Sequence, residues 1–200
     1  MKEKQQLYCF IDTETTGVHI HENHCIHQIA AILVDMDAGE EIDTFEIKFR
    51  PDDDVIEAAA TGALEKCKET KDTLRARSIS SSEAYYQFQD FISKYVNRFD
   101  KKDKLHFVAY NAKFDSDFVR AWAERNGDVY YGSFFWHPAL CVLQRFAIWS
   151  RSVRQHILNC QLGTVCKLCF IDFNEENAHD ALYDVRKTIE LWNKLEKFGG

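Results

Sequence analysis

The sequence predicts an α/β protein in which a mixed sheet carries helices on both faces. Three observations lead to this prediction: a continuously apolar run at residues 7–11, three further strand-like segments, and several segments whose apolar residues recur at helical spacing. The chain has 200 residues, 46% of them hydrophobic, with only two prolines and eight glycines. A chain of this size can bury a substantial core, so we expect one domain over residues 1–200.

The first half of the chain is predicted to supply three strands and two helical regions. The strands, which we expect to form an antiparallel meander, are residues 7–11, 28–34 and 41–49. Asp35 to Gly39 begins like a calcium-binding loop but lacks the later ligands, so it predicts a hairpin turn. Helical spacing follows over 55–67 and 82–99. The polar segment 66–82 predicts a mobile surface loop.

The second half is predicted to alternate one buried strand with helices. Residues 105–110 are apolar enough to form that strand. Apolar residues at helical spacing then predict helices over 118–125, 138–150 and 157–168. The last helix carries an apolar face formed by Val185, Ile189, Leu191 and Leu195.

Two carboxylates lie at the end of the first predicted strand. Asp12 and Glu14 are two positions apart, so they point to the same side of a strand, and Gly17 lets the chain turn away. Hard divalent cations such as Mg²⁺ are held by a few carboxylates together with substrate phosphates. The pair therefore favours phosphate chemistry, although a lone Asp-x-Glu is more often a solvated strand end.

Further acidic residues occur at two predicted helix starts. Asn111 and Asp115 follow the strand at 105–110, and His179, Asp180 and Asp184 precede or begin the last helix. Taken singly, each has a simpler explanation. Asn111, Asp115 or Asp180 can cap a helix, and His179 can be an ordinary surface histidine.

Taken together, the three segments resemble the motifs of the DEDDh exonucleases, also called DnaQ-like or RNase T-like 3′–5′ exonucleases. Residues 10–17 (FIDTETTG), 110–115 (YNAKFD) and 179–184 (HDALYD) resemble the first, second and third motifs of that family. The first, in its Asp-Thr-Glu-Thr-Thr-Gly form, also resembles the proofreading subunits of bacterial replicases. The resemblance spans residues 7–195. It implies a ribonuclease H-like fold with about five strands in the mixed sheet and helices on both faces.

The resemblance also implies a two-metal phosphodiester hydrolase that uses Mg²⁺ or Mn²⁺. The metal ligands and catalytic carboxylates that the resemblance implies are Asp12, Glu14, Asp115 and Asp184. His179 is the general base that removes a proton from the attacking water. Candidate substrate-binding residues are Thr15, Thr16, Tyr110, Asn111 and Phe114, with His19 and Ile20 as further candidates for contact with the terminal base.

The net charge of −7 limits the kind of nucleic acid that we expect to bind. Such a surface has no general attraction for a polyanion, but an enzyme that engages only a strand end needs few phosphate contacts. Those contacts could come from Lys113, Arg145, Arg151 and Arg154. We expect release of nucleoside 5′-monophosphates from a single-stranded or frayed 3′ end, with DNA slightly favoured over RNA.

Several alternatives stay open at this point. RNA 3′-end trimming or an oligoribonuclease-like activity requires the same residues, and no residue identified in the sequence reads a 2′-hydroxyl. The enzyme could act alone or as the proofreading partner of a DNA polymerase. A noncatalytic nucleic-acid or protein binding module on the same fold, or a phosphoesterase for small nucleotides, would be a different class of function. The oligomeric state is not indicated.

Residues 1–6 lack the apolar core of a signal peptide and no apolar run is long enough to span a membrane, so we expect a cytoplasmic protein with seven reduced cysteines. His156, Cys160, Cys166 and Cys169 could form a zinc set, but their helical spacing favours a packed helix. The histidines at positions 19, 21, 24 and 27 predict a loop after the first motif, with metal binding as the less favoured reading.

Overall fold

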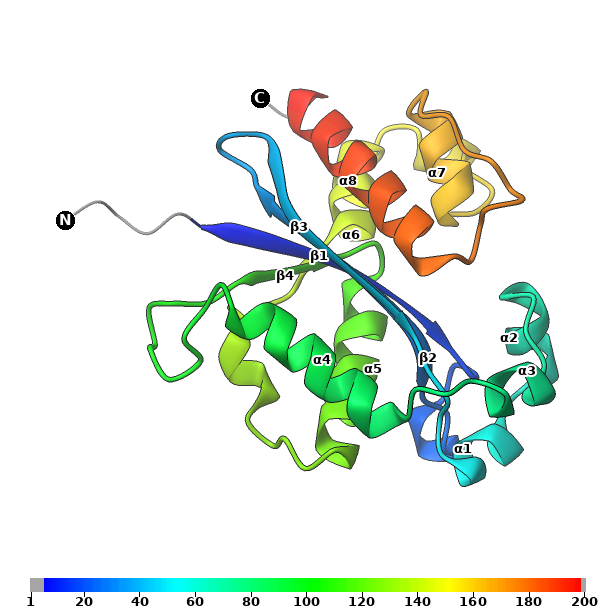
Figure 1. Ribbon diagram of the computed structural model, residues 1–200. Coiled ribbons are helices and arrows are strands. Elements are labelled where there is room, and N and C mark those ends of the chain that lie inside the picture. The colour runs from blue at the N-terminus through cyan, green and yellow to red at the C-terminus, as the bar shows by residue number, and fades with distance from the viewer. Residues whose placement is uncertain (1–5, 199–200) are drawn as a thin grey trace.

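The computed structural model describes residues 6–198 and shows a five-stranded mixed sheet between two layers of helices (Figure 1). The strand order is β3-β2-β1-β4-β5. The strands are β1 (Leu7–Thr15), β2 (Ile26–Asp35), β3 (Glu40–Lys48), β4 (His106–Ala109) and β5 (Leu140–Cys141). The first three form the predicted antiparallel meander, whereas β4 is parallel to both β1 and β5.

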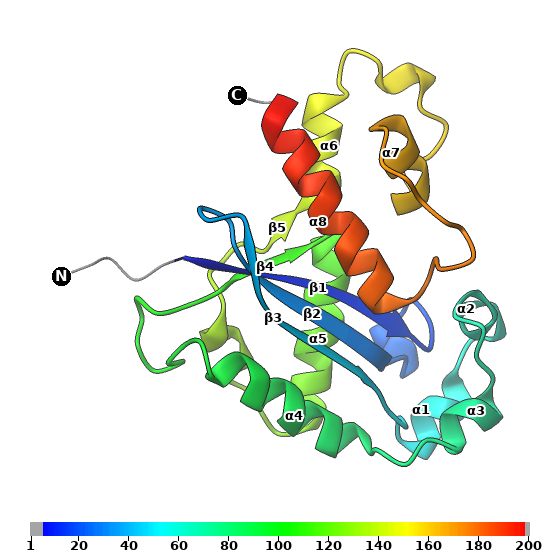
Figure 2. The same cartoon turned by 45° about the horizontal axis from the view of Figure 1, so that its top comes forward.

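The helices cover both faces of the sheet, as predicted (Figures 1 and 2). One face carries α4 (Ser81–Ser93) and α5 (Ala112–Arg125). The other face carries α6 (Val142–Trp149), α7 (Leu162–Leu168) and α8 (Ala181–Phe198). Three short helices lie beyond the ends of the strands: α1 (Asp53–Ala58), α2 (Thr61–Lys66) and α3 (Lys71–Arg75). Short 3₁₀ helices occur at η1 (Ile20–Glu22), η2 (Tyr131–Phe134) and η3 (Arg154–His156).

Strand β1 is buried on both faces, and its side-chain alternation decides where the acidic residues point. Cys9 and Ile11 belong to the core beneath α4 and α5, whereas Phe10 belongs to the core beneath α8. The Phe10 ring meets Trp192 of α8 edge-on, with 5.9 Å between ring centroids. Because side chains alternate along a strand, Asp12 and Glu14 follow Phe10 onto the α8 face.

Three predictions for the first half of the chain were wrong in detail. The helical pattern at 55–67 is broken into α1 and α2, and the pattern at 82–99 gives a helix that ends at Ser93. The segment 66–82 is not a plain loop, since it contains α3. Thr70 caps that helix by a capping box with Thr73, and Leu74 is fully buried. A cap and one buried side chain therefore order a segment whose composition is polar.

In the second half, three helices begin at other residues than the pattern predicted. The segment 138–150 contains β5 before α6 begins at Val142, because Leu140 and Cys141 extend the sheet beside β4. The helix predicted from residue 157 begins at Leu162, and Leu158 is 99% exposed, so its apolar character does not mark a packed face. Helix α5 begins at Ala112, six residues earlier than predicted. No helix within residues 6–198 is long and apolar enough to cross a membrane.

Candidate active site

The second half of β1 has a free edge, and the first turn of α5 fills it. The last β1 residue paired with β4 is Phe10, and the chain leaves β4 at Ala109 to begin α5. Asp115, in the first turn of α5, accepts hydrogen bonds at Oδ1 from the Thr13 backbone N–H (3.1 Å) and hydroxyl (2.9 Å). The carboxylate thus replaces a strand partner, which fixes Asp115 beside Asp12 and Glu14.

The beginning of α8 brings two further residues to the same place. Asp180 Oδ1 accepts from the Tyr183 N–H at 3.2 Å and so caps the helix. Asp184 Oδ2 accepts from the His179 N–H at 3.2 Å. His179 has a φ of 62°, a left-handed conformation that is uncommon for residues other than glycine. This backbone turn places the imidazole next to Asp184.

These segments converge on a cluster of metal-binding groups. Ligand atoms of Glu14, His179 and Asp184 lie within 4.8 Å of one another, and residues 6–198 contain no other such group of three or more. Burial, together with the charges of Asp115, Glu14 and Asp184, raises the pKa of Asp12 well above its usual value. Burial is also the main reason why the pKa values of Asp115 and Asp184 rise to about 7.

The donor set fits divalent metal ions. Asp184 Oδ1 is buried and has no hydrogen-bond partner among the described residues. Buried acceptors without a partner are costly, and clustered carboxylates repel one another. Carboxylate oxygens suit Mg²⁺ or Mn²⁺, whose charge would relieve both penalties. The cluster therefore has the chemistry of a metal site, and bound cations would offset the repulsion between its carboxylates.

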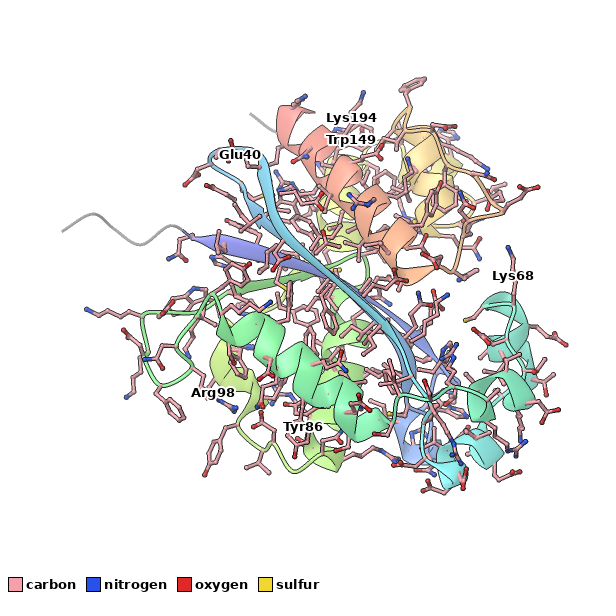
Figure 3. The ribbon with its side chains drawn as sticks, viewed as in Figure 1. Glu40, Lys68, Tyr86, Arg98, Trp149 and Lys194 are labelled. Carbon is pink, nitrogen blue, oxygen red and sulfur yellow. The ribbon has the colours of Figure 1, made fainter. Side chains whose placement is uncertain are left out.

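Two residues that were not predicted from the sequence orient the carboxylates. The Cys67 thiol, just beyond α2, donates to Glu14 Oε2 at 2.9 Å, while Thr13 holds Asp115. The adjacent Lys68, labelled in Figure 3, lies just beyond the end of α2. It donates to the Glu176 carbonyl oxygen and so connects this end of α2 to the loop before α8. Thr13 could have been found inside the first motif, but Cys67 is 53 residues from Glu14 and gives no local signal.

The two predicted substrate-binding threonines hold the turn after β1. The Thr15 hydroxyl donates to the Gly17 carbonyl at 2.7 Å, and the Thr16 hydroxyl accepts from the Cys25 N–H at 3.0 Å. A Cβ at Gly17 would lie 2.4 Å from the His24 ring, so only glycine fits there. Thr16 is fully buried, and its hydroxyl faces protein rather than an open surface.

The other substrate candidates lie around the start of α5. The Tyr110 hydroxyl donates to the Cys160 carbonyl at 2.5 Å, and Phe114 is partly buried against Phe118, with 4.7 Å between ring centroids. Asn111 is exposed at the N-terminal end of α5, and its side chain makes no cap hydrogen bond. Of these three, Asn111 has the side chain most available to a ligand.

The basic candidates are dispersed. Lys113 pairs with Asp117 at 2.6 Å, and Arg145 lies over the Trp192 ring at 4.5 Å. Arg151 and Arg154 are exposed and donate to nearby backbone carbonyls. None of these four is among the residues that bond to the acidic cluster within the part of the chain that the structure describes.

The alternative metal sets are not assembled. Cys166 and Cys169 are buried as apolar residues in or next to α7, and the group His156, Cys160, Cys166 and Cys169 is not brought together within metal-binding distance. The four histidines are not in one loop. His27 is fully buried in β2, and His24 Nδ1 accepts from the His19 N–H at 3.0 Å.

Known proteins resemble this chain in sequence and in fold. The model of the family described as exonuclease, of the RNase T type, matches residues 9–192. Ribonuclease T of Shewanella denitrificans is 33% identical over 132 residues, which are 62% of this chain and 52% of that protein. The matched part thus spans about half the length of that relative. Ribonuclease T of Vibrio campbellii is 26% identical over 95% of this chain and 87% of that protein.

Solved structures share the fold. The structure of E. coli Exonuclease I with single-stranded DNA has a TM-score of 0.76 and 22% identity, and it covers 98% of this chain and 41% of that one. The nuclease domain of 3′hExo, a DEDDh family member bound to rAMP, has a TM-score of 0.68 and 15% identity over 100% and 96% of the two chains. The predicted ribonuclease H-like fold is therefore confirmed.

Proposed function

The chain belongs to the RNase T-type exonuclease family, and from this premise we propose that it is a metal-dependent 3′–5′ exonuclease. It releases nucleoside 5′-monophosphates from single-stranded or frayed 3′ ends, and residues 1–200 act as one catalytic domain. The observation that carries the proposal is the convergence of Glu14, His179 and Asp184 from β1, the loop before α8 and α8 itself. Asp12 and Asp115 complete the set.

The proposed mechanism assigns a role to each of these side chains. Two Mg²⁺ or Mn²⁺ ions, when bound, would supply an activated water and stabilise the leaving 3′ oxygen. Asp12, Glu14, Asp115 and Asp184 would hold them. His179 accepts the proton of the attacking water at a ring nitrogen. Burial and the nearby Lys66 lower the pKa of His179, so the imidazole is neutral and able to accept a proton near pH 7.

The supporting residues act through the carboxylates. Thr13 keeps Asp115 turned toward β1, and the Cys67 thiol keeps Glu14 in one orientation. Asn111 is exposed at the start of α5, next to the cluster, where it can contact the terminal nucleotide. A ligand shell that is already oriented in the free protein needs little rearrangement when substrate binds.

The sugar preference is part of the proposal and has two candidates. The curated relatives are named Ribonuclease T, which favours RNA 3′ ends, whereas the solved Exonuclease I structure contains single-stranded DNA. The form of the first motif, residues 10–17, slightly favours DNA. Both substrates belong in the first experiment. A polymerase partner has no support among these relatives.

The test is digestion of 5′-labelled single-stranded DNA and RNA of matched sequence, with Mg²⁺, Mn²⁺ or EDTA. We expect a metal-dependent ladder that shortens from the 3′ end. Asp12→Ala should remove it, and His179→Ala should slow turnover by roughly 10²–10⁴-fold while metal binding persists. Asp90→Asn, an exposed acid on α4, is the matched control and should leave the rate unchanged.

Two results would contradict the proposal. Shortening from the 5′ end would reverse the assigned direction. No cleavage of either oligomer with either metal, by a folded protein, would exclude a nuclease that acts alone and would favour a noncatalytic binding module.

A further inference from the structure

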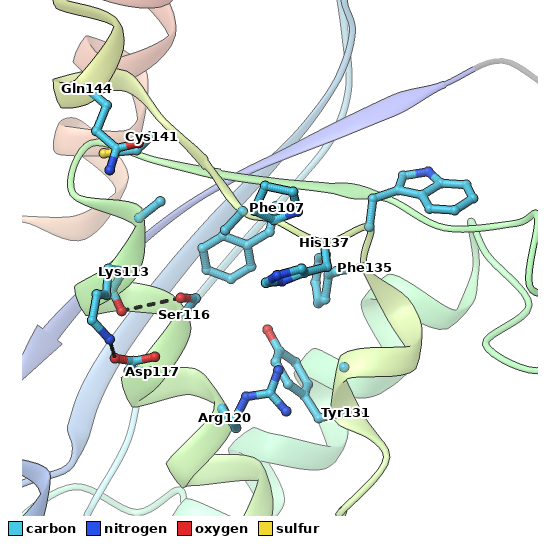
Figure 4. Close-up of a pocket in the computed structure, with 15 residues that line it drawn as sticks. Phe107, Lys113, Ser116, Asp117, Arg120, Tyr131, Phe135, His137, Cys141 and Gln144 are labelled. Carbon is cyan, nitrogen blue, oxygen red and sulfur yellow. Dashed lines mark hydrogen bonds and ion pairs between the residues drawn. The ribbon is translucent and has the colours of Figure 1, made fainter. Parts of the chain in front are cut away.

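A pocket lies on the far side of α5 from the acidic cluster. Its volume is about 480 Å³, and its walls come from α5, η2 and the segment 135–141 that leads into β5 (Figure 4). Pockets that bind small molecules usually measure about 300–1,000 Å³. None of the proposed metal-binding residues lines this pocket.

The two faces of α5 separate this pocket from the proposed active site. Asp115 points toward β1, where it accepts hydrogen bonds from Thr13. Lys113, Ser116 and Arg120 are spaced by three and four residues, so they share a different stripe of the helix, and they line the pocket. Helix α5 therefore contributes different side chains to the proposed active site and to this pocket.

The pocket contains an unbalanced positive charge. Arg120 has no hydrogen-bond or ion-pair partner among residues 6–198. Its guanidinium lies against the backbone of η2, where a Cβ on Gly132 would be 3.2 Å from the Arg120 Nη2 atom. The only carboxylate in the wall is Asp117, which Lys113 already neutralises at 2.6 Å. Arg120 is exposed, so its guanidinium is accessible to a phosphate group.

The opposite wall is aromatic and contains a hydroxyl without a partner. Phe107 and Phe135 meet edge-to-face at 5.3 Å, and Tyr131 packs on Phe135 at the same centroid distance. Tyr131 is 4% exposed, and its hydroxyl has no hydrogen-bond partner among the described residues. In Figure 4 this hydroxyl points into the space between Ser116 and His137. Buried hydroxyls usually find a partner, so this one marks a place for a polar ligand atom.

We propose that this pocket binds one nucleotide unit, with its phosphate on Arg120 and its base on the exposed ring of His137. Phe107 and Phe135 are buried (3% and 8% exposed) and form the apolar floor beneath the base, and a polar edge atom of the base can meet the Tyr131 hydroxyl. The choice of a nucleotide among anionic aromatic ligands rests on the proposed function. The ligand is then either a released mononucleotide or an upstream nucleotide of the bound strand.

The test is calorimetric titration of the whole chain with AMP and dAMP in EDTA, so that no reaction occurs and the acidic cluster repels the phosphate. We expect one binding site. Arg120→Ala should weaken binding at least tenfold, and Tyr131→Phe should weaken it several-fold without lowering the melting temperature, because the hydroxyl has no protein partner. Lys101→Ala, which removes an exposed lysine without a described contact, is the charge-matched control and should bind like wild type.

A second titration with oligonucleotides of one to six nucleotides identifies the source of the unit. If Arg120→Ala weakens the binding of mononucleotides, the pocket is a product site. If Arg120→Ala weakens the binding of longer oligonucleotides only, the pocket is a subsite for the bound strand. Binding of every ligand at wild-type strength by Arg120→Ala, or no binding by folded wild type, would overturn the proposal. Because no turnover is measured, failure here is distinguishable from failure of the proposed nuclease activity.

Discussion

Asp184 lowers the stability of the metal-free fold but supplies a ligand to the proposed metal site. Its carboxylate is buried, one of its oxygens has no partner among the described residues, and burial followed by the charge of Glu14 raises its pKa to about 7. A carboxyl whose pKa is raised in the folded state binds its proton more tightly there than in the unfolded chain. Its contribution to stability is therefore present at low pH and is lost as the pH rises toward 7.

We predict that Asp184→Asn stabilises the metal-free protein at pH 8 by on the order of 2 kcal/mol, since the amide carries no charge to desolvate. At pH 4, where the carboxyl is protonated, the two proteins should differ little. Urea unfolding in EDTA at both pH values measures the difference. Equal stability at pH 8 would contradict the charge-repulsion explanation. Added Mg²⁺ should raise the melting temperature of wild type more than that of the variant.

Cys67 is predicted to act on metal affinity rather than on the chemical step. Its thiol donates to Glu14 Oε2, and burial keeps its pKa raised, so the proton stays on sulfur. Cys67→Ala should raise the Mg²⁺ concentration needed for half-maximal activity several-fold and leave the rate at saturating Mg²⁺ within about twofold. Cys67→Ser retains a hydrogen-bond donor, so its Mg²⁺ requirement should lie between those of wild type and Cys67→Ala. A lower rate at saturating metal in Cys67→Ala would contradict a purely orienting role.

At the scale of elements, the sequence predicted the strands and helices that a short stretch of residues specifies by itself. Strands β1 to β4, the hairpin before Gly39 and helix α8 were found because apolar alternation and helical spacing are properties of short segments. Strand β5 was missed, since two residues carry no periodicity and exist as a strand only beside β4. The bond from Cys67 to Glu14 was missed for the same reason, because it joins residues far apart in the chain.

The segment 66–82 was predicted to be a mobile surface loop, whereas the structure shows that Arg77 attaches it to the sheet. Arg77 Nη1 donates to the backbone carbonyls of His27 (2.7 Å) and Phe49 (2.9 Å), and Nη2 pairs with Glu69. The side chains of Arg77 and Glu69 are only 13% and 16% exposed. This arginine therefore ties the segment to the ends of β2 and β3, and the sequence gives no hint of these backbone partners.

We predict that Arg77→Ala destabilises the protein by about 3 kcal/mol, because two carbonyls and one carboxylate lose their partner. Hydrogen exchange should rise first in residues 66–82. Arg75→Ala is the matched control, since Arg75 makes only solvent-exposed ion pairs with Glu57 and Asp72 and should cost less than about 1 kcal/mol. Equal losses in the two variants would contradict the assigned role of Arg77.

At the scale of the whole molecule, the proposed active site exists only when the sheet is complete. Its ligands come from positions 12 to 184, and Asp115 reaches β1 only because β4 pairs in parallel with β1 and ends early. The three motifs could be recognised in the sequence, but their approach depends on this pairing. Metal binding should therefore be coupled to global folding, since the unfolded chain keeps the ligands apart.

Because the net charge is −7, we predict that the binding of single-stranded nucleic acid depends only weakly on salt concentration. The pocket beside His179 is lined by three basic side chains, Lys48, Lys68 and Arg186, and two of them are paired with Asp180 and Glu41. Binding should therefore involve two or three phosphates. The slope of log K against log salt should then be about −1.4 to −2.1, since each phosphate contact on a single strand contributes about −0.7. Fluorescence anisotropy with labelled oligomers, Mg²⁺ and the His179→Ala variant measures this slope without rapid cleavage. A slope steeper than about −4 would mean that a long basic track binds the strand, which the dispersed positions of Lys113, Arg145, Arg151 and Arg154 do not provide.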